Sequence, residues 1–119
     1  MSLDAAVDTV FAAVRTGLPG ETYVPRMQSA LVANVASLMV GDRDIEIKFV
    51  GIRPGEKIHE ILVSEEEIFR TYARDHYYVI ASVLEEFKGE PALVQEFDSE
   101  DVVMNFSDTA KFLEENRIL

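Results

Sequence analysis

The chain has 119 residues, of which 48% are hydrophobic and 28% charged, and this composition excludes a disordered or fibrous protein. Its formal net charge of -11 excludes a general nucleic-acid binder, because such proteins need Lys and Arg to displace counterions from phosphates. The absence of cysteine excludes disulfides and thiolate zinc sites, and we expect no metal site.

The length predicts a single domain with one modest core. Residues 1–3 have the character of a start added for expression, so we expect the domain to span residues 4–119. No apolar run reaches the roughly 18 residues that cross a bilayer, and the N-terminus lacks a signal-peptide pattern. We therefore expect a cytoplasmic protein without a membrane partner.

The acidic residues are concentrated in the second half of the chain. Residues 1–60 hold 8 Asp or Glu against 6 Lys or Arg, while residues 61–119 hold 14 against 5. An anion-binding site is therefore expected in the first half.

The first half predicts alternating helices and strands. Apolar residues recur over 4–16 at the spacing of a helix with one buried face, and β-forming residues between glycine and proline predict a short strand over 20–25. Ser29 suits the N-cap of a second amphipathic helix, which Gly41 closes. Apolar and charged residues alternate over 45–49, which predicts a half-buried strand.

The second half is less regular. Residues 58–62 fit either a short helix or a strand, and residues 64–67 are typical of a helix cap with an acidic first turn. Aromatic and branched residues predict a strand over 77–80, followed by an acidic loop, and Ser107 with Asp108 opens a last helix. Together these elements predict a small α/β or α+β domain, with helices flanking a short mixed sheet.

Between the two halves, Arg53, Pro54, Gly55 and Glu56 form a turn directly after a predicted strand, where α/β folds commonly present ligand-binding loops. A guanidinium there can bind a diphosphate through its planar fork, and a carboxylate can accept hydrogen bonds from two ribose hydroxyls. The alternative is a surface ion pair between Arg53 and Glu56, worth about 0–1 kcal/mol.

The surrounding sequence adds a family resemblance. Residues 51–67, GIRPGEKIHEILVSEEE, resemble the C-terminal signature of bacterial polysaccharide-biosynthesis proteins in the extended short-chain dehydrogenase/reductase superfamily. That group includes UDP-N-acetylglucosamine 4,6-dehydratases and UDP-glucose or UDP-N-acetylglucosamine 4-epimerases. The likeness extends to residues 4–27, 75–80 and 96–102, and so covers nearly the whole chain.

The resemblance implies a role for individual residues. The Arg-x-Gly-acid element of the superfamily closes over the UDP end of the substrate, which implies that Arg53 binds the pyrophosphate and Glu56 the ribose. Pro54 and Gly55 would shape the loop. The Val-Pro-Arg-Met segment is presented towards the nucleotide in the family, so Arg26 is a further candidate, although a solvated surface arginine is an equal alternative.

The sequence departs from the superfamily at its N-terminal side. It has no GxGxxG loop and no tyrosine followed four residues later by lysine, so we expect no cofactor-binding or catalytic residue in it. The resemblance implies that NAD or NADP acts in the full-length enzyme, on an N-terminal Rossmann domain that this chain lacks. We expect the apolar surface facing that domain to drive self-association of the chain.

The resulting hypothesis is a UDP-sugar-binding fragment, catalytically incomplete alone, from a dehydratase or epimerase of polysaccharide or capsule synthesis. Two other functions stay open, namely a stand-alone acidic protein-interaction module and a UDP-binding regulatory domain. His59 and His76 show no evident carboxylate or nucleophile partner in the sequence, and we assign them no catalytic role.

Overall fold

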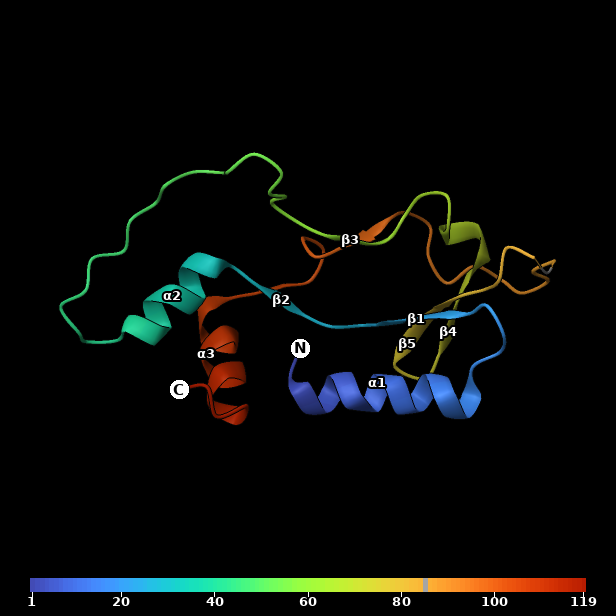
Figure 1. The fold of residues 1–119 in the computed structure, drawn as a ribbon, viewed down its shortest axis with the longest axis horizontal. Coiled ribbons are helices and arrows are strands. Elements are labelled where there is room, and N and C mark those ends of the chain that lie inside the picture. The colour runs from blue at the N-terminus through green and yellow to red at the C-terminus, as the bar shows by residue number, and fades with distance from the viewer. Residues whose placement is uncertain (85) are drawn as a thin grey trace. The chain divides into compact units, whose positions relative to one another are not determined.

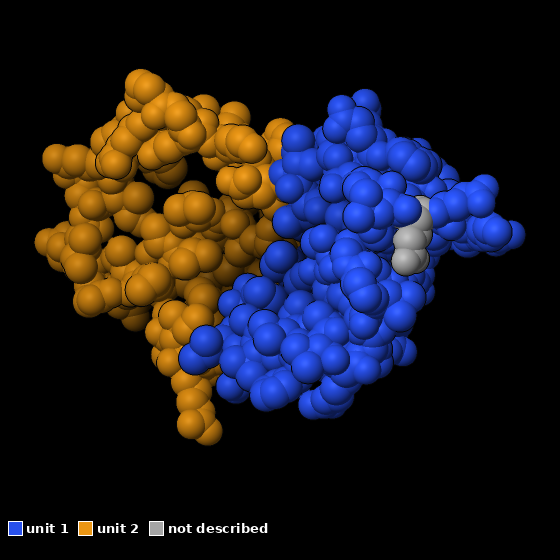
Figure 2. All heavy atoms as spheres, turned by 45° about the vertical axis from the view of Figure 1, so that its right-hand side comes forward, with its two compact units in different colours: residues 1–27, 61–98 blue, residues 28–60, 99–119 orange. Residues whose placement is uncertain are grey.

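The computed structural model describes residues 1–84 and 86–119, and it confirms a small mixed α/β fold. Three α-helices are present in these residues: Leu3–Thr16 (α1), Val32–Val40 (α2) and Phe106–Glu115 (α3) (Figure 1). None of them combines the length and the apolar character needed to cross a membrane. The chain divides into two compact units, unit 1 with residues 1–27 and 61–98 and unit 2 with residues 28–60 and 99–119 (Figure 2).

Unit 1 is built on a three-stranded antiparallel sheet in the order β1-β5-β4. Its strands are Thr22–Pro25 (β1), Thr71–Arg74 (β4) and Tyr77–Ile80 (β5). β4 and β5 form a hairpin in which Asp75 has a φ of 51°, a left-handed conformation that aspartate tolerates. The strands predicted over 20–25 and 77–80 are thereby confirmed.

A second antiparallel pair in unit 1 joins Ile61–Val63 (β3) to Phe97–Asp98 (β6), with an irregular register. Val63 and Val79 are fully buried, and Ile80 and Phe97 nearly so, which means that residues of both sheets form the core of this unit. β3 resolves the ambiguous stretch around residue 61 as a strand. β6 lies in the stretch that the sequence predicts to be a loop.

The chain between β3 and β4 forms a turn where the sequence predicts a helix cap, but a short 3₁₀ helix rather than an α-helix follows, and its N-cap Glu67 makes no side-chain cap bond. The backbone N–H and the hydroxyl of Ser64 both donate to the Glu67 carboxylate, at 3.2 and 2.9 Å. This reciprocal arrangement begins a turn that leads into a 3₁₀ helix, Ile68–Arg70 (η1). The acidic run therefore stabilises a local turn.

α1 confirms the helix predicted over 4–16 to within one residue. It begins at Ser2, whose Oγ accepts the Ala5 N–H at 3.2 Å, and it lies against β1. The prediction of a buried face is wrong for the described residues, because no side chain of α1 is buried. The apolar residues that share its face are exposed: Leu3, Val7, Val10, Phe11 and Val14.

Unit 2 packs α2 against α3 and contains a short parallel pair, Ser29–Ala30 (β2) with Val103–Met104 (β7). Met104, Thr109 and Leu113 are its buried residues. α3 confirms the predicted last helix, but Asn105 caps it, since its Oδ1 accepts the Asp108 N–H at 2.8 Å.

The predicted N-cap role of Ser29 is wrong. Ser29 lies in β2, and its hydroxyl donates to the Ser99 carbonyl while its N–H donates to the carbonyl of Val102 at 3.1 Å. The hydroxyl that a cap would use is thus engaged by the Ser99 carbonyl. Leu31 holds the N-cap position of α2 without a side-chain hydrogen bond, and Gly41 closes that helix as predicted.

The predicted strand over 45–49 is also wrong. Residues 41–60 contain neither helix nor strand and form a long excursion after α2 (Figure 1). A strand becomes regular structure only when a neighbouring strand accepts its backbone hydrogen bonds, and none lies beside this segment in the described residues. The turn at Arg53 therefore follows an unpaired segment.

Candidate functional site

The structure brings Arg53 and Glu56 together across an exposed turn of unit 2. The Arg53 N–H donates to Oε2 of Glu56 at 2.9 Å, and the Glu56 N–H donates to the Arg53 carbonyl at 3.1 Å. Nε of Arg53 lies 3.9 Å from Oε1 of Glu56. Gly55 adopts a φ of +88°, which favours glycine, and Pro54 precedes it.

This geometry has two consequences. The ion pair itself is the weak surface contact that the sequence allowed, since both side chains are exposed and solvent screens them. However, the closest approach uses Nε, and the two terminal nitrogens of Arg53 lie on the outer end of the guanidinium. The turn thus carries an exposed cation, the guanidinium of Arg53.

Arg26 lies in unit 1, directly after β1. Its guanidinium carbon sits 4.4 Å from the centroid of the Tyr78 ring, and Tyr78 makes an edge contact with Phe97 at 5.2 Å. The Arg26 N–H donates to the carbonyl of His76 at 3.2 Å. The side chain is therefore held by a cation–π contact while the residue stays exposed to solvent.

Unit 1 also holds an ion-pair cluster that sequence reasoning missed. Glu21 and Arg74 form a two-point pair, with Nη1–Oε2 at 2.8 Å and Nη2–Oε1 at 3.1 Å. Their side chains are 5% and 23% exposed. Glu21 also accepts the Leu18 N–H at 2.9 Å and the Tyr72 hydroxyl, and Arg74 also donates to the hydroxyl of Tyr23.

Burial and these hydrogen bonds shift the pKa values of the cluster. Burial alone raises the pKa of Glu21, but the hydrogen bonds from Leu18, Tyr72 and Arg74 outweigh it and hold the pKa below its ordinary value. Burial, aided by the hydrogen bond to Glu21, raises the pKa of Tyr72 to about 12. Burial lowers the pKa of Arg74, and the bonds to Glu21 and Tyr23 reverse this, so Arg74 stays charged.

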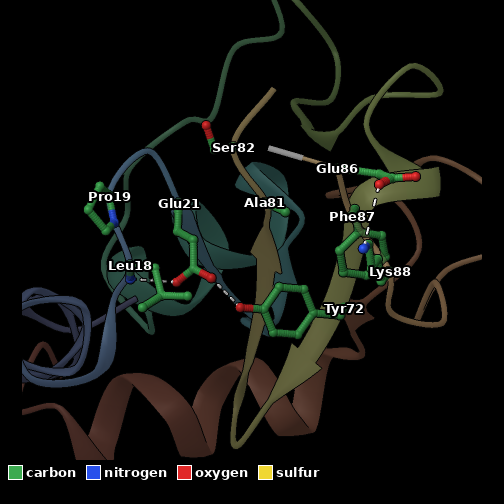
Figure 3. Close-up of a pocket in the computed structure, with 9 residues that line it drawn as sticks. All are labelled: Leu18, Pro19, Glu21, Tyr72, Ala81, Ser82, Glu86, Phe87 and Lys88. Carbon is green, nitrogen blue, oxygen red and sulfur yellow. Dashed lines mark hydrogen bonds and ion pairs between the residues drawn. The ribbon is translucent and has the colours of Figure 1, made fainter. Parts of the chain in front are cut away.

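A half-open pocket of about 170 Å³ lies beside this cluster (Figure 3). Figure 3 shows the Glu21 carboxylate between the Leu18 backbone and the Tyr72 hydroxyl, and Tyr72 stacks on Phe87 with centroids 5.6 Å apart. The pocket is lined by Leu18, Pro19, Glu21, Tyr72, Ala81, Ser82, Glu86, Phe87 and Lys88. Because the polar atoms of Glu21 already bond within the protein, we read the cluster as a support for the fold of unit 1.

His59 has a partner that the sequence did not reveal. Its Nδ1 lies 3.6 Å from the carboxylate of Glu100, and both side chains are exposed. The expectation that this histidine lacks a carboxylate partner is wrong. The two residues are 41 positions apart, so no local pattern joins them.

The comparisons with known proteins now decide the family. The family described as polysaccharide biosynthesis protein matches residues 1–82, which include Arg26 and the turn from Arg53 to Glu56. The chain belongs to this family. The predicted resemblance is thereby confirmed, and it rests on more than half of the sequence.

Individual members of the family agree with this result. The chain is 32% identical, over 81 residues, to a UDP-N-acetylglucosamine 4,6-dehydratase (inverting) of Campylobacter jejuni, covering 68% of this chain and 24% of that protein. It is 35% identical, over 82 residues, to a UDP-glucose 4-epimerase of Rickettsia massiliae, covering 67% and 24%. The chain thus spans about a quarter of the length of these relatives.

Two further similarities cover nearly the whole chain. An uncharacterized membrane protein of Methanocaldococcus jannaschii is 29% identical over 127 residues, covering 99% of this chain and 35% of that protein. The X-ray structure of Pen from Bacillus thuringiensis matches with a TM-score of 0.84 and 20% identity, covering 100% of this chain and 38% of that one. At this identity the structural match shows the fold alone.

Proposed function

We propose that this chain binds the UDP end of a nucleotide sugar, as part of an NAD(P)-dependent 4,6-dehydratase or 4-epimerase of polysaccharide or capsule synthesis in the cytoplasm. Family membership and the names of the relatives support the enzyme class. In such an enzyme the nicotinamide cofactor supplies the oxidation and reduction of the sugar. This chain's sequence lacks the glycine-rich loop that binds the dinucleotide, so we assign no redox step to its residues.

The observation that carries the proposal is the turn from Arg53 to Glu56. Its backbone is fixed by two reciprocal hydrogen bonds between these residues, so a ligand does not have to order it. The exposed guanidinium of Arg53 then presents its terminal N–H groups to a diphosphate, for which a planar fork makes short charge-assisted bonds.

Glu56 is assigned to the ribose. One of its oxygens accepts the Arg53 N–H at 2.9 Å, while the other makes only the 3.9 Å contact with Nε. A carboxylate offers about four lone-pair sites, so acceptor capacity remains for a pair of ribose hydroxyls. The same carboxylate thus shapes the turn and binds the sugar.

Arg26 is proposed as an alternative phosphate ligand, in unit 1. Its contact with Tyr78 restricts the guanidinium before binding and leaves its N–H groups in the plane of the fork for an anion. A basic residue at this position would attract an anion locally, although the net charge of the chain is strongly negative.

The test is a titration of the chain with UDP, and with uridine as a ligand that lacks the diphosphate, followed by amide chemical shifts. We expect weak binding of UDP, with the largest shifts at residues 51–57. Arg53→Ala should weaken it roughly 10- to 150-fold, the equivalent of a charge-assisted hydrogen bond worth about 1.5–3 kcal/mol. Lys57→Ala is the matched control, because it removes a similarly exposed cation next to the turn, with a side chain 65% exposed against 75% for Arg53.

Each outcome separates the candidate functions. The absence of any response to UDP would favour the acidic interaction module, and micromolar affinity would favour a UDP-binding regulatory domain. If Arg53→Ala and Lys57→Ala weaken binding equally, the turn contributes only nonspecific charge and the assignment of Arg53 fails. Shifts confined to residues around Arg26 would move the diphosphate site into unit 1.

A further inference from the structure

Side chains alternate along the segment 45–49 as they do in a strand, although no strand of the described residues pairs with it. Nζ of Lys48 lies 3.4 Å from Oε2 of Glu46, and residues two apart share a face only when the backbone is extended. The residues between and beside them therefore belong to the opposite face. Ile45, Ile47 and Phe49 are 52%, 36% and 83% exposed.

The backbone of this segment is also open. Within the described part of the chain, the Ile45 N–H donates to the Arg43 carbonyl at 2.8 Å, and no backbone hydrogen bond joins residues 46–52 to another segment. An extended segment with unpaired N–H and C=O groups and an apolar face is a template for another strand. Its sequence then decides which strand fits.

We propose that residues 45–49 pair with the same residues of a second copy of this chain, antiparallel and centred on Ile47. This register places Ile47 opposite Ile47 and Ile45 opposite Phe49 on one face. On the other face it places Glu46 opposite Lys48, and the two-fold symmetry repeats this ion pair. Charge complementarity thus identifies the partner as a second copy.

Neighbouring registers are selected against. A slip that centres the pairing on residue 46 sets Lys48 opposite Asp44 at both symmetric positions but opposes Glu46 to itself, and one that centres it on residue 48 opposes Lys48 to itself. A slip that centres the pairing between two neighbouring residues sets apolar side chains opposite charged ones. Over residues 45–49, only the Ile47-centred register sets apolar side chains opposite apolar ones and opposite charges opposite each other throughout.

The pairing is independent of the proposed function, because it uses none of the proposed ligand residues. The symmetry is closed, so the contact yields a dimer and no fibre. The paired segment is short, and we therefore expect a weak dimer that is detected in a concentration series up to roughly 1 mM.

The experiment is sedimentation equilibrium of the chain and four variants. Glu46→Lys and Lys48→Glu each create like-charge contacts at both symmetric positions, so each should weaken dimerisation about tenfold. The double variant Glu46→Lys/Lys48→Glu restores opposite charges and should restore dimerisation. Glu114→Lys, on an exposed residue of α3, is the control because it makes the same charge change elsewhere.

Isotope-filtered NOEs in a mixed-label sample locate the contact. We expect intermolecular NOEs between the side chains of Ile45 and Phe49. A strictly monomeric chain at the highest concentration overturns the proposal, and so does a dimer that all three single variants weaken equally. Intermolecular NOEs confined to α1 would assign the dimer to the helix and also overturn it.

Discussion

Replacing Arg74 with alanine tests whether the ion-pair cluster stabilises unit 1. The substitution removes both contacts to Glu21, at 2.8 and 3.1 Å, and the bond from Nη1 to the Thr16 carbonyl at 2.7 Å. The Glu21 side chain, which is 5% exposed in the wild-type protein, then loses its counter-ion. The substitution lowers the free energy of unfolding because it leaves a buried charge without a counter-ion.

The expected loss in the free energy of unfolding is about 3 kcal/mol. Breaking a buried pair by removing one partner costs roughly 3–5 kcal/mol. The lower end applies because Glu21 keeps two donors, the Leu18 N–H and the Tyr72 hydroxyl. Arg74→Lys keeps the charge and loses the two-point geometry, so its loss should be intermediate.

Tyrosine fluorescence is the assay, followed through urea denaturation. All four tyrosines lie in unit 1, at positions 23, 72, 77 and 78, and the chain has no tryptophan. The signal therefore reports on the unit that contains the cluster. Because both Tyr23 and Tyr72 contact Arg74, their spectra should be recorded in the folded state first as a baseline.

Arg15→Ala is the control for this measurement. Arg15 is an exposed arginine on α1, and its removal makes the same change in net charge. We expect its effect to stay within about 0.5 kcal/mol, as is usual for surface substitutions. Equal losses for Arg74→Ala and Arg15→Ala would refute the argument, since burial would then confer no added cost.

Other predictions address pH, packing and capping. Because the pKa of Glu21 is lowered below 4.5 in the folded state, its stabilisation is present above that pH and is lost as pH falls through the lowered value; Glu21→Gln should remove this part of an acid denaturation curve. The pKa of Tyr72 is raised from 10.0 to about 12, so its stabilisation is present below pH 10 and is lost towards pH 12; Tyr72→Phe should flatten that limb in an alkaline titration. Gly20→Ala should destabilise unit 1 by more than about 1 kcal/mol in urea, because Gly20 has a φ of +82° and an added Cβ would lie 2.7 Å from Oγ of Ser82. Asn105→Ala should cost about 1 kcal/mol and speed amide exchange in α3, whereas Asn105→Ser should keep most of the protection; equal exchange in both variants would contradict the cap.

The elements that sequence predicted well are those fixed by neighbouring residues. α1, β1 and β5 follow from spacing and residue type over a few positions, and the hydrogen-bonded turn between Ser64 and Glu67 spans a three-residue interval. The turn at Arg53 belongs to the same class, because its hydrogen bonds also span three residues. Local interactions of this kind leave a readable pattern.

The features that sequence reasoning missed depend on distant residues. Glu21 and Arg74 are 53 positions apart, and only the antiparallel pairing of β1, β5 and β4 brings their parts of the chain together. Ser29 illustrates the same point, because its bond to Ser99 crosses 70 positions and removes it from the cap of α2. A good local signal at Ser29 was outweighed by tertiary contacts.

The errors over burial have a different cause. The period of a pattern identifies which residues share a face, as it did for α1, but it does not identify what covers that face. The apolar face of α1 and the segment 45–49 differ in how narrowly their side chains restrict a binding partner. The face of α1 is apolar throughout and accepts many surfaces, whereas the alternation of Glu46 and Lys48 beside Ile47 distinguishes one register from its neighbours. Since specificity requires that wrong pairings be disfavoured, the strand segment and not the helix is where a defined homotypic contact is expected.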